Sequence, residues 1–331
     1  MQLRLAKRIE VWILENIVIS YSPHVHGGEN IKKIMRDVII ALIPALLGSL
    51  YFFGFRSLVL IITSAAFCVL FEYLWDKAVK KNNTTKDLSA IVTGILLAFS
   101  MPVNVPLYVI IVGDAFAIIV VKCFYGGIGQ NFVNPALAAR AFLLACWPVA
   151  MTSWVKVNDS LGLFGKASVN VDAVTSATPL SHASEAVSYI DLFFGHVGGC
   201  IGETSVLLIL LGGIYLIMRK VITPVIPVTY IVSVGLFGFL FTDKSFLFNI
   251  MSGGIMLAGF FMATDYVTSP VSAMGQFIYA LAAGIITAII RAYGSYPEGV
   301  TYSILIMNIV TPLIDKHIKP RVFGKAVNKN E

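Results

Sequence analysis

One polar segment of the chain carries a short motif with a defined chemistry. Residues 172–178 read Asp-Ala-Val-Thr-Ser-Ala-Thr and are followed by Pro179 and Leu180. This order fits Asp-x-x-Ser/Thr-Gly/Ser-Ala-Thr, the pattern at which a flavin transferase joins the phosphate of flavin mononucleotide (FMN) to the last threonine's hydroxyl. An ordinary Ser/Thr-rich turn is the alternative, because these side chains also bond their own backbone in loops. We expect covalent FMN on Thr178, with the other recognition positions at Asp172, Thr175, Ser176 and Ala177.

The motif belongs to a polar stretch of the chain, 151–190, that separates two hydrophobic blocks. An enzyme can reach a surface segment of this kind, whereas a buried helix could not be modified in the same way. The composition of the whole chain explains what the two blocks are. With 57% hydrophobic and 13% charged residues and a mean hydropathy of +0.84, it has too little polar surface for a soluble fold. The sequence therefore predicts an integral membrane protein.

The net charge of +6 does not indicate nucleic-acid binding. The cations lie at the ends of apolar segments and form no basic face alternating with aromatic residues, so orientation in a bilayer is the better explanation. Four cysteines form no Cys-x-x-Cys pair, and the five histidines form no set with metal-ligand spacing. We therefore expect neither a zinc site nor a disulfide framework.

Ten segments are apolar enough to cross a bilayer, allowing for shorter or broken helices. They are Val38–Phe55, Leu58–Trp75, Leu88–Met101, Val105–Phe124, Pro135–Ala150, Thr204–Met218, Val221–Phe241, Phe246–Ala263, Gln276–Ile290 and Tyr302–Ile314. With the N-terminus inside the cell, most Lys and Arg residues fall on the cytoplasmic side, as the positive-inside rule requires. The same orientation of the ten spans places both termini in the cytoplasm and Thr178 outside it.

The spans and loops divide the chain into five parts. We expect an N-terminal cytoplasmic or interfacial segment at 1–35 and a first membrane repeat at 36–150. They are followed by an extracytoplasmic flavin-attachment loop at 151–200, a second membrane repeat at 201–315 and a basic cytoplasmic tail at 316–331. The two repeats share fragments in the same order. Gly94-Ile-Leu-Leu-Ala98 returns as Gly254-Ile-Met-Leu-Ala258, and Tyr108 to Ile119 shares its spacing with Tyr279 to Ile290. Each match lies five spans apart, which predicts an all-α, five-plus-five inverted repeat with spans three and eight at its centre.

Ionisable residues in or near the spans invite explanation, because a charge at mid-bilayer costs roughly 2.5 to 3.5 kcal/mol on insertion scales. The most deeply placed, Asp114 and Arg140, could simply pair with each other, or Asp114 could serve cation movement. Asp265 and Asp315 both map towards the cytoplasmic surface, where a cation entry site would need carboxylate oxygens. Glu203 completes the candidates for an ion pathway.

The run Gly126 to Pro135 follows span four and is rich in glycine and asparagine. It is not a dinucleotide-binding fingerprint, because it follows a membrane span rather than a strand. Its plain function is to start span five, with Asn134 as the N-cap and Pro135 at the first helical position. The amides of Asn131 and Asn134 could alternatively bond a second, non-covalent flavin near the cytoplasmic face.

These motifs together resemble a known family. It contains the RnfD subunit of the Rnf complex and the NqrB subunit of the sodium-pumping NADH:quinone reductase. The likeness covers nearly the whole chain and rests on Ser22-Pro23-His24, Gly126 to Arg140, 172–180, Gly202 to Ser205, Phe261 to Asp265, Tyr296 to Gly299, Asn308 and Thr311 to Asp315. A brief N-terminal extension favours the Rnf subunit. Ser176 departs from the glycine that is common in the flavin motif.

The resemblance implies a ten-helix fold similar to urea transporters, FMN on Thr178 and non-covalent riboflavin at Asn131 and Asn134. It links Asp265 and Asp315 to cation uptake. The implied function is an electron relay between reduced ferredoxin and NAD⁺, coupled to Na⁺ or H⁺ translocation across a bacterial or archaeal plasma membrane. Implied partners are the Rnf A, B, C, E and G subunits, with iron-sulfur and flavin centres, and a flavin transferase. The alternatives are the quinone reductase subunit and a cofactor-free urea-transporter-like channel.

Overall fold

The computed structural model describes residues 30–79, 84–154, 188–294 and 299–318. Within these ranges every regular element is helical. The elements are α2 (Ile31–Phe53), α3 (Phe55–Val79), η1 (Thr85–Asp87), α4 (Ser89–Phe99), α5 (Leu107–Ala115), η2 (Phe116–Cys123), α6 (Pro135–Cys146), α7 (Pro148–Met151), α8 (Tyr189–Phe194), α9 (Val206–Met218), α10 (Val225–Phe241), α11 (Phe246–Met251), α12 (Ile255–Leu257), η3 (Ala258–Met262), α13 (Ala273–Tyr293) and α14 (Val300–His317). The prediction of an all-helical protein is confirmed for the described residues.

Among the described residues, three helices are long and apolar enough to cross a membrane, namely α2, α3 and α13. Only 33% of the most apolar stretch of α2 and of α3 is buried inside the chain, so large apolar side chains such as Tyr51 and Ile62 stay exposed. A helix surface of this kind is suited to lipid or to another membrane protein rather than to water. Shorter apolar helices, among them α4, α6, α9 and α10, lie between the long ones.

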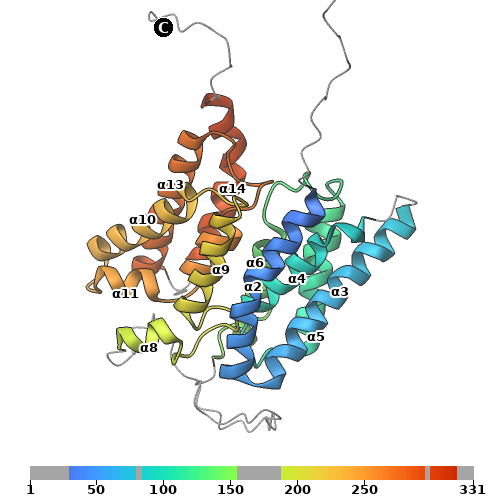
Figure 1. Cartoon of the computed structure of the whole chain (residues 1–331), viewed down its shortest axis with the longest axis horizontal. Helices are drawn as coiled ribbons and strands as arrows, with labels where there is room; N and C mark the ends of the chain where they lie inside the picture. Colours follow the sequence, from blue (N-terminus) through green and yellow to red (C-terminus); the bar gives the residue numbers. More distant parts are fainter. Residues whose placement is uncertain (1–29, 80–83, 155–187, 295–298, 319–331) are drawn as a thin grey trace, which may run out of the picture.

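The helices form two groups that lie side by side in Figure 1. The first group, α2 to α7, is coloured blue to green, and the second group, α8 to α14, is coloured yellow to red. The groups meet where α2 packs against α9 and where α6 packs against α14. Within the second group, α10 packs along α13.

The short elements α4 and η3 lie deep in the protein. Nine of the eleven residues of α4 and all five of η3 are buried, in contrast to the half-exposed long helices. Gly94 allows this close approach on the α4 side, because an added Cβ would lie only 2.8 Å from the Cα of Ala65 on α3. Small residues permit such close helix contacts in membrane proteins.

The segment predicted as span eight, Phe246–Ala263, is not one continuous helix. The sequence Ser252-Gly253-Gly254 interrupts it, with Gly253 at φ 66° in the left-handed region that favours glycine. Arg291 of α13 compensates for the break by donating hydrogen bonds to the carbonyls of Asn249 (3.2 Å) and Ser252 (3.0 Å). Side chains that satisfy freed backbone groups are what makes broken helices tolerable inside a membrane.

Candidate functional site

A cavity of about 380 Å³ lies between the two groups of helices. Its apolar walls come from α2, α4 and η3, and its polar lining includes Ser89, Lys122, Asn131, Asn134, Thr264 and Asp265. Mostly apolar cavities with a few convergent polar groups are the usual form of ligand sites. The structure therefore places Asp265, named for cation entry, in the same cavity as Asn131 and Asn134, which were named for a non-covalent flavin.

Asn134 has the structural role expected of it. Its Oδ1 accepts hydrogen bonds from the backbone N–H groups of Ala136 (3.0 Å) and Leu137 (3.3 Å), so it caps α6, and Pro135 is the first helical residue. Its Nδ2 donates to the carbonyl of Met262 at 3.2 Å and thereby connects α6 to the end of η3. The N-cap prediction is confirmed, and much of the amide's hydrogen-bonding capacity is used by the fold.

Two further amide contacts surround this cap. The Asn131 Nδ2 donates to the carbonyl of Val133 at 3.0 Å, which shapes the loop before α6. The side chain of Asn308 on α14 lies 2.8 Å from the Tyr279 hydroxyl, and its oxygen, in the orientation that satisfies all neighbours, accepts from the Asn134 N–H at 3.1 Å. The start of α6 is thus held by groups from α13 and α14.

Asp265 lies at the cavity wall in the turn that follows η3. Its carboxylate accepts long hydrogen bonds of 3.4 Å from the Val267 N–H and from the Thr268 hydroxyl. Desolvation raises the pKa of the Asp265 carboxyl above its ordinary value, and the two hydrogen bonds offset only part of this rise. Asp315 on α14 bonds the same turn at a different point, accepting from the Val271 N–H at 3.2 Å.

Asp265 and Asp315 do not form a ready-made metal site. No group of three or more His, Cys, Asp or Glu side chains that could hold a metal ion occurs in the part of the chain that the structure describes. Any cation at Asp265 would therefore need backbone oxygens, water or a partner subunit to complete its ligands.

Glu203 and Asp114 occupy two separate buried sites. Arg140 of α6 pairs with Glu203, with Nη1 3.0 Å from Oε1 and both side chains almost fully buried. Asp114 of α5 instead forms hydrogen bonds with Ser64 and Cys68 of α3. The alternative of an Asp114–Arg140 pair is therefore wrong, because the turn before α9 brings a different carboxylate to Arg140.

The residues of the flavin motif lie outside the described part of the chain, so FMN attachment at Thr178 stays a prediction. The same holds for the recognition positions Asp172, Thr175, Ser176 and Ala177. The five-part division of the chain also stays a prediction, because its loop and both terminal segments fall largely in the same undescribed ranges.

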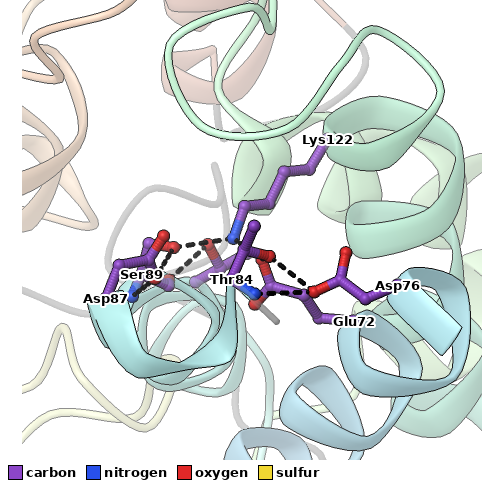
Figure 2. A network of polar contacts seen from close by, with 7 residues as sticks. Glu72, Asp76, Thr84, Asp87, Ser89 and Lys122 are labelled. Carbon is purple, nitrogen blue, oxygen red and sulfur yellow. Dashed lines mark hydrogen bonds and ion pairs between the residues drawn. The ribbon is translucent and has the colours of Figure 1, made fainter. Parts of the chain in front are cut away.

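The structure adds a buried ionic group that the sequence did not indicate (Figure 2). Lys122 at the end of η2 is buried, and its Nζ lies 2.6 Å from Glu72 Oε1 on α3 and 2.6 Å from Ser89 Oγ at the start of α4. In the sequence, Lys122 is only one of the charges that orient the chain. A signal that could have pointed to this group is the pair Glu72 and Asp76, because two carboxylates four residues apart at the end of an apolar span lie on one face of a helix.

The Lys122 group continues towards the loop that precedes α4. Asp76 Oδ2 accepts from the backbone N–H and the hydroxyl of Thr84, both at 2.8 Å. Asp87 Oδ1 accepts from the Ser89 N–H at 2.9 Å and from its hydroxyl at 2.6 Å. Three segments are thereby joined at one end of the first group, beside the cavity wall that Ser89 and Lys122 help to form.

The fold and site together describe a helical, multi-pass membrane protein with an internal cavity between two groups of helices. The sequence model of the NQR2, RnfD, RnfE family matches residues 18–324. The chain therefore belongs to this family.

Individual relatives are similar over nearly their whole length. The D subunit of the Na⁺-translocating ferredoxin:NAD⁺ oxidoreductase complex of Acetobacterium woodii is 46% identical over 323 residues, which is 96% of this chain and 98% of that protein. The D subunit of the proton-translocating ferredoxin:NAD⁺ oxidoreductase complex of Clostridium ljungdahlii is 43% identical, over 95% of this chain and 98% of the relative. The D subunit of an ion-translocating oxidoreductase complex of Escherichia coli is 33% identical, over 92% and 98%.

Proposed function

We propose that this chain is the membrane flavoprotein subunit of an Rnf complex, which carries electrons between reduced ferredoxin and NAD⁺ and couples the transfer to Na⁺ or H⁺ translocation. The observation that carries the proposal is the flavin-attachment motif at 172–178 in a chain of this family. Relatives named as sodium-translocating and as proton-translocating subunits are both similar over almost the full length, which supports either ion.

The electron chemistry in this proposal belongs to flavin, which accepts and donates electrons when bound, and the protein supplies its position. Thr178 provides the hydroxyl that a flavin transferase esterifies with the phosphate of FMN. The amino-acid sequence contains no nicotinamide or iron-sulfur motif. Ferredoxin oxidation and NAD⁺ reduction are therefore assigned to partners, namely the Rnf A, B, C, E and G subunits.

A non-covalent riboflavin fits the cavity between the two groups of helices. The cavity volume of about 380 Å³ and its largely apolar walls suit a flat aromatic ring. Gly129 lines it with φ 86°, and a Cβ there would meet nothing within 4 Å, so the backbone stands next to open space. Asn131 and Asn134 would lie beside the bound ring. Because Asn134 already caps α6, Asn131 is the better candidate for direct recognition.

For ion movement we propose Asp265 as the first carboxylate on the cytoplasmic side, because it borders the cavity. Asp315 supports the same turn through the Val271 N–H. Glu203 is engaged by Arg140, which favours a role in joining the two groups. Reduction of a flavin in the cavity would add negative charge near Asp265 and so favour cation binding there.

We further propose ten membrane crossings arranged as an inverted repeat, with both termini in the cytoplasm and the flavin loop outside. The positions of the helices support this arrangement, since a helical element occupies each of the ten apolar segments. The distribution of Lys and Arg supports the orientation. A green fluorescent protein fused to the C-terminus should fluoresce in cells, and an exported alkaline phosphatase inserted at 160 should be active. The opposite pattern would reverse the orientation.

Thr178→Val tests the flavin assignment directly. The protein is produced in cells that contain the flavin transferase, denatured, and examined for ultraviolet flavin fluorescence on a gel and by intact-mass analysis. Wild type and the control Thr152→Val should carry the mass of FMN, and Thr178→Val should lack it. Fluorescence that persists in Thr178→Val would move the attachment site, and an unmodified wild type would favour the cofactor-free channel.

A further inference from the structure

Asp114 is a carboxyl group enclosed in the core of the first group of helices. The residue is 0% exposed. Its Oδ1 lies 2.6 Å from Ser64 Oγ and 3.3 Å from Cys68 Sγ, both on α3. Its Oδ2 is buried and has no hydrogen-bond partner among the described residues. A carboxylate with a bare buried oxygen would be very costly in this environment.

The charged groups around Asp114 are engaged elsewhere. Glu72 and Asp76 lie on α3, Lys122 on η2 and Arg140 on α6, while α4 carries no charged side chain. Lys122 contacts Glu72, and Arg140 contacts Glu203. Within the described ranges no cation forms an ion pair with Asp114, so such a pair does not explain how the carboxyl is accommodated.

The hydrogen-bond partners of Ser64 indicate the protonation state of Asp114. Ser64 Oγ lies 2.8 Å from the Gly94 carbonyl and 2.6 Å from Asp114 Oδ1. A hydroxyl group has one proton to donate, and a carbonyl has none. If Asp114 were ionised, Ser64 would face two acceptors, and one of the two short contacts would lack a proton.

A proton on Asp114 Oδ1 satisfies every contact. The Cys68 thiol then donates to Oδ1, Oδ1–H donates to Ser64 Oγ, and the Ser64 hydroxyl donates to the Gly94 carbonyl. The remaining Oδ2 becomes a neutral carbonyl oxygen, which is much less costly to bury than a charged one. The close contact of α4 with α3 at Gly94 holds this chain of donors in place.

We propose that Asp114 is a proton-binding site in the membrane core, with the proton on Oδ1 shared towards Ser64 at neutral pH. The ligand is a proton rather than a metal cation, because a hard cation needs several oxygen ligands and a thiol occupies one side of this carboxyl. Loss of the proton would place an uncompensated charge between α3, α4 and α5. Proton binding at Asp114 therefore affects how α3, α4 and α5 pack in the first group of helices.

Infrared spectroscopy of the membrane-reconstituted full chain tests the protonation state. Wild type at neutral pH should show the carbonyl stretch of a protonated carboxylic acid, shifted in deuterium oxide. The band should be absent from Asp114→Asn and present in the control Asp243→Asn, which changes an exposed aspartate. Absence of the band from wild type, or its loss on adding Na⁺ at constant pH, would overturn the proposal.

Thermal unfolding gives a second readout that does not depend on flavin. An unfolded aspartate ionises above a pH of about 4, whereas the buried one keeps its proton, so rising pH favours the unfolded state. The Asp114→Asn variant has no such proton to lose, and its amide can still donate to Ser64. The difference between the Tm of Asp114→Asn and that of wild type should therefore increase in favour of the variant from pH 5 to pH 8, by roughly one to a few degrees per pH unit. A Tm difference between the two proteins that does not change with pH would contradict a bound proton.

Discussion

Arg140 and Glu203 form a buried ion pair that joins the two groups of helices. Arg140 belongs to α6, Glu203 precedes α9, and their side chains meet at 3.0 Å with exposures of 7% and 4%. Gly254, at the start of α12, leaves room for this pair, because a Cβ there would lie 2.3 Å from Glu203 Oε1. The ion pair therefore links α6 to the turn before α9, next to the start of α12. It is a second connection between the two groups, besides the packing of α2 on α9.

Glu203→Ala should destabilise the protein strongly, because it leaves the Arg140 guanidinium buried without its carboxylate. The expected loss in the free energy of unfolding is about 3–5 kcal/mol. Thermal unfolding in detergent measures it. The double variant Arg140→Met with Glu203→Met removes both charges and should recover much of the loss. Additive losses in the double variant would show that the two residues act independently.

Lys122→Ala should be far more harmful than the same change at an exposed lysine. Lys122 bonds Glu72 and Ser89 in a buried network, so its removal leaves the Glu72 charge uncompensated. We expect a loss of about 3–5 kcal/mol, against less than about 0.5 kcal/mol for Lys77→Ala on the exposed side of α3. Equal unfolding temperatures for the two variants would contradict the buried network.

Gly94→Ala should separate α3 from α4. The added methyl group would lie 2.8 Å from both the Ala65 Cα and the Ser64 carbonyl oxygen, and neither backbone atom can move by itself. Overpacking of this kind costs about 1–3 kcal/mol. Gly199→Ala is the matched control, since its Cβ would meet nothing within 4 Å. If both variants unfold at the wild-type temperature, the close contact at Gly94 is not needed.

Asp265→Asn tests the proposed cation entry site in the assembled complex. If the carboxylate binds Na⁺, its removal should weaken the apparent Na⁺ affinity of ferredoxin-dependent NAD⁺ reduction by about tenfold, or roughly 1.4 kcal/mol. Asp243→Asn should have no effect. Unchanged Na⁺ dependence and ion transport in Asp265→Asn would exclude this carboxylate from the pathway.

The raised pKa of Asp265 adds a pH dependence to the same assay. Because protonation neutralises the carboxyl as the pH falls through that pKa, protons should compete with Na⁺, and the apparent Na⁺ affinity of wild type should decrease towards acidic pH. The affinity in Asp265→Asn should depend less on pH. A wild-type affinity that is independent of pH would rule out competition at this residue.

The sequence alone predicted the class of protein and the apolar segments that the helices occupy. Composition and apolar run length decide these features, because a bilayer requires long apolar segments with satisfied backbone groups. The start of α6 was equally readable, since an Asn-Pro pair is a local signal that needs no distant partner. Continuity of a span was harder to judge, and the break at Ser252 to Gly254 depends on Arg291 of another helix.

Only the tertiary structure decided which buried charges meet. Sequence position put Asp114 and Arg140 at similar depths, yet depth does not specify the side of a helix or its neighbours. The turn before α9 delivers Glu203 to Arg140, η2 delivers Lys122 to Glu72, and Ser64 with Cys68 surrounds Asp114. Apolar helices share a small alphabet and can pack in many ways, so the few polar partners become known only when the helices are placed in three dimensions.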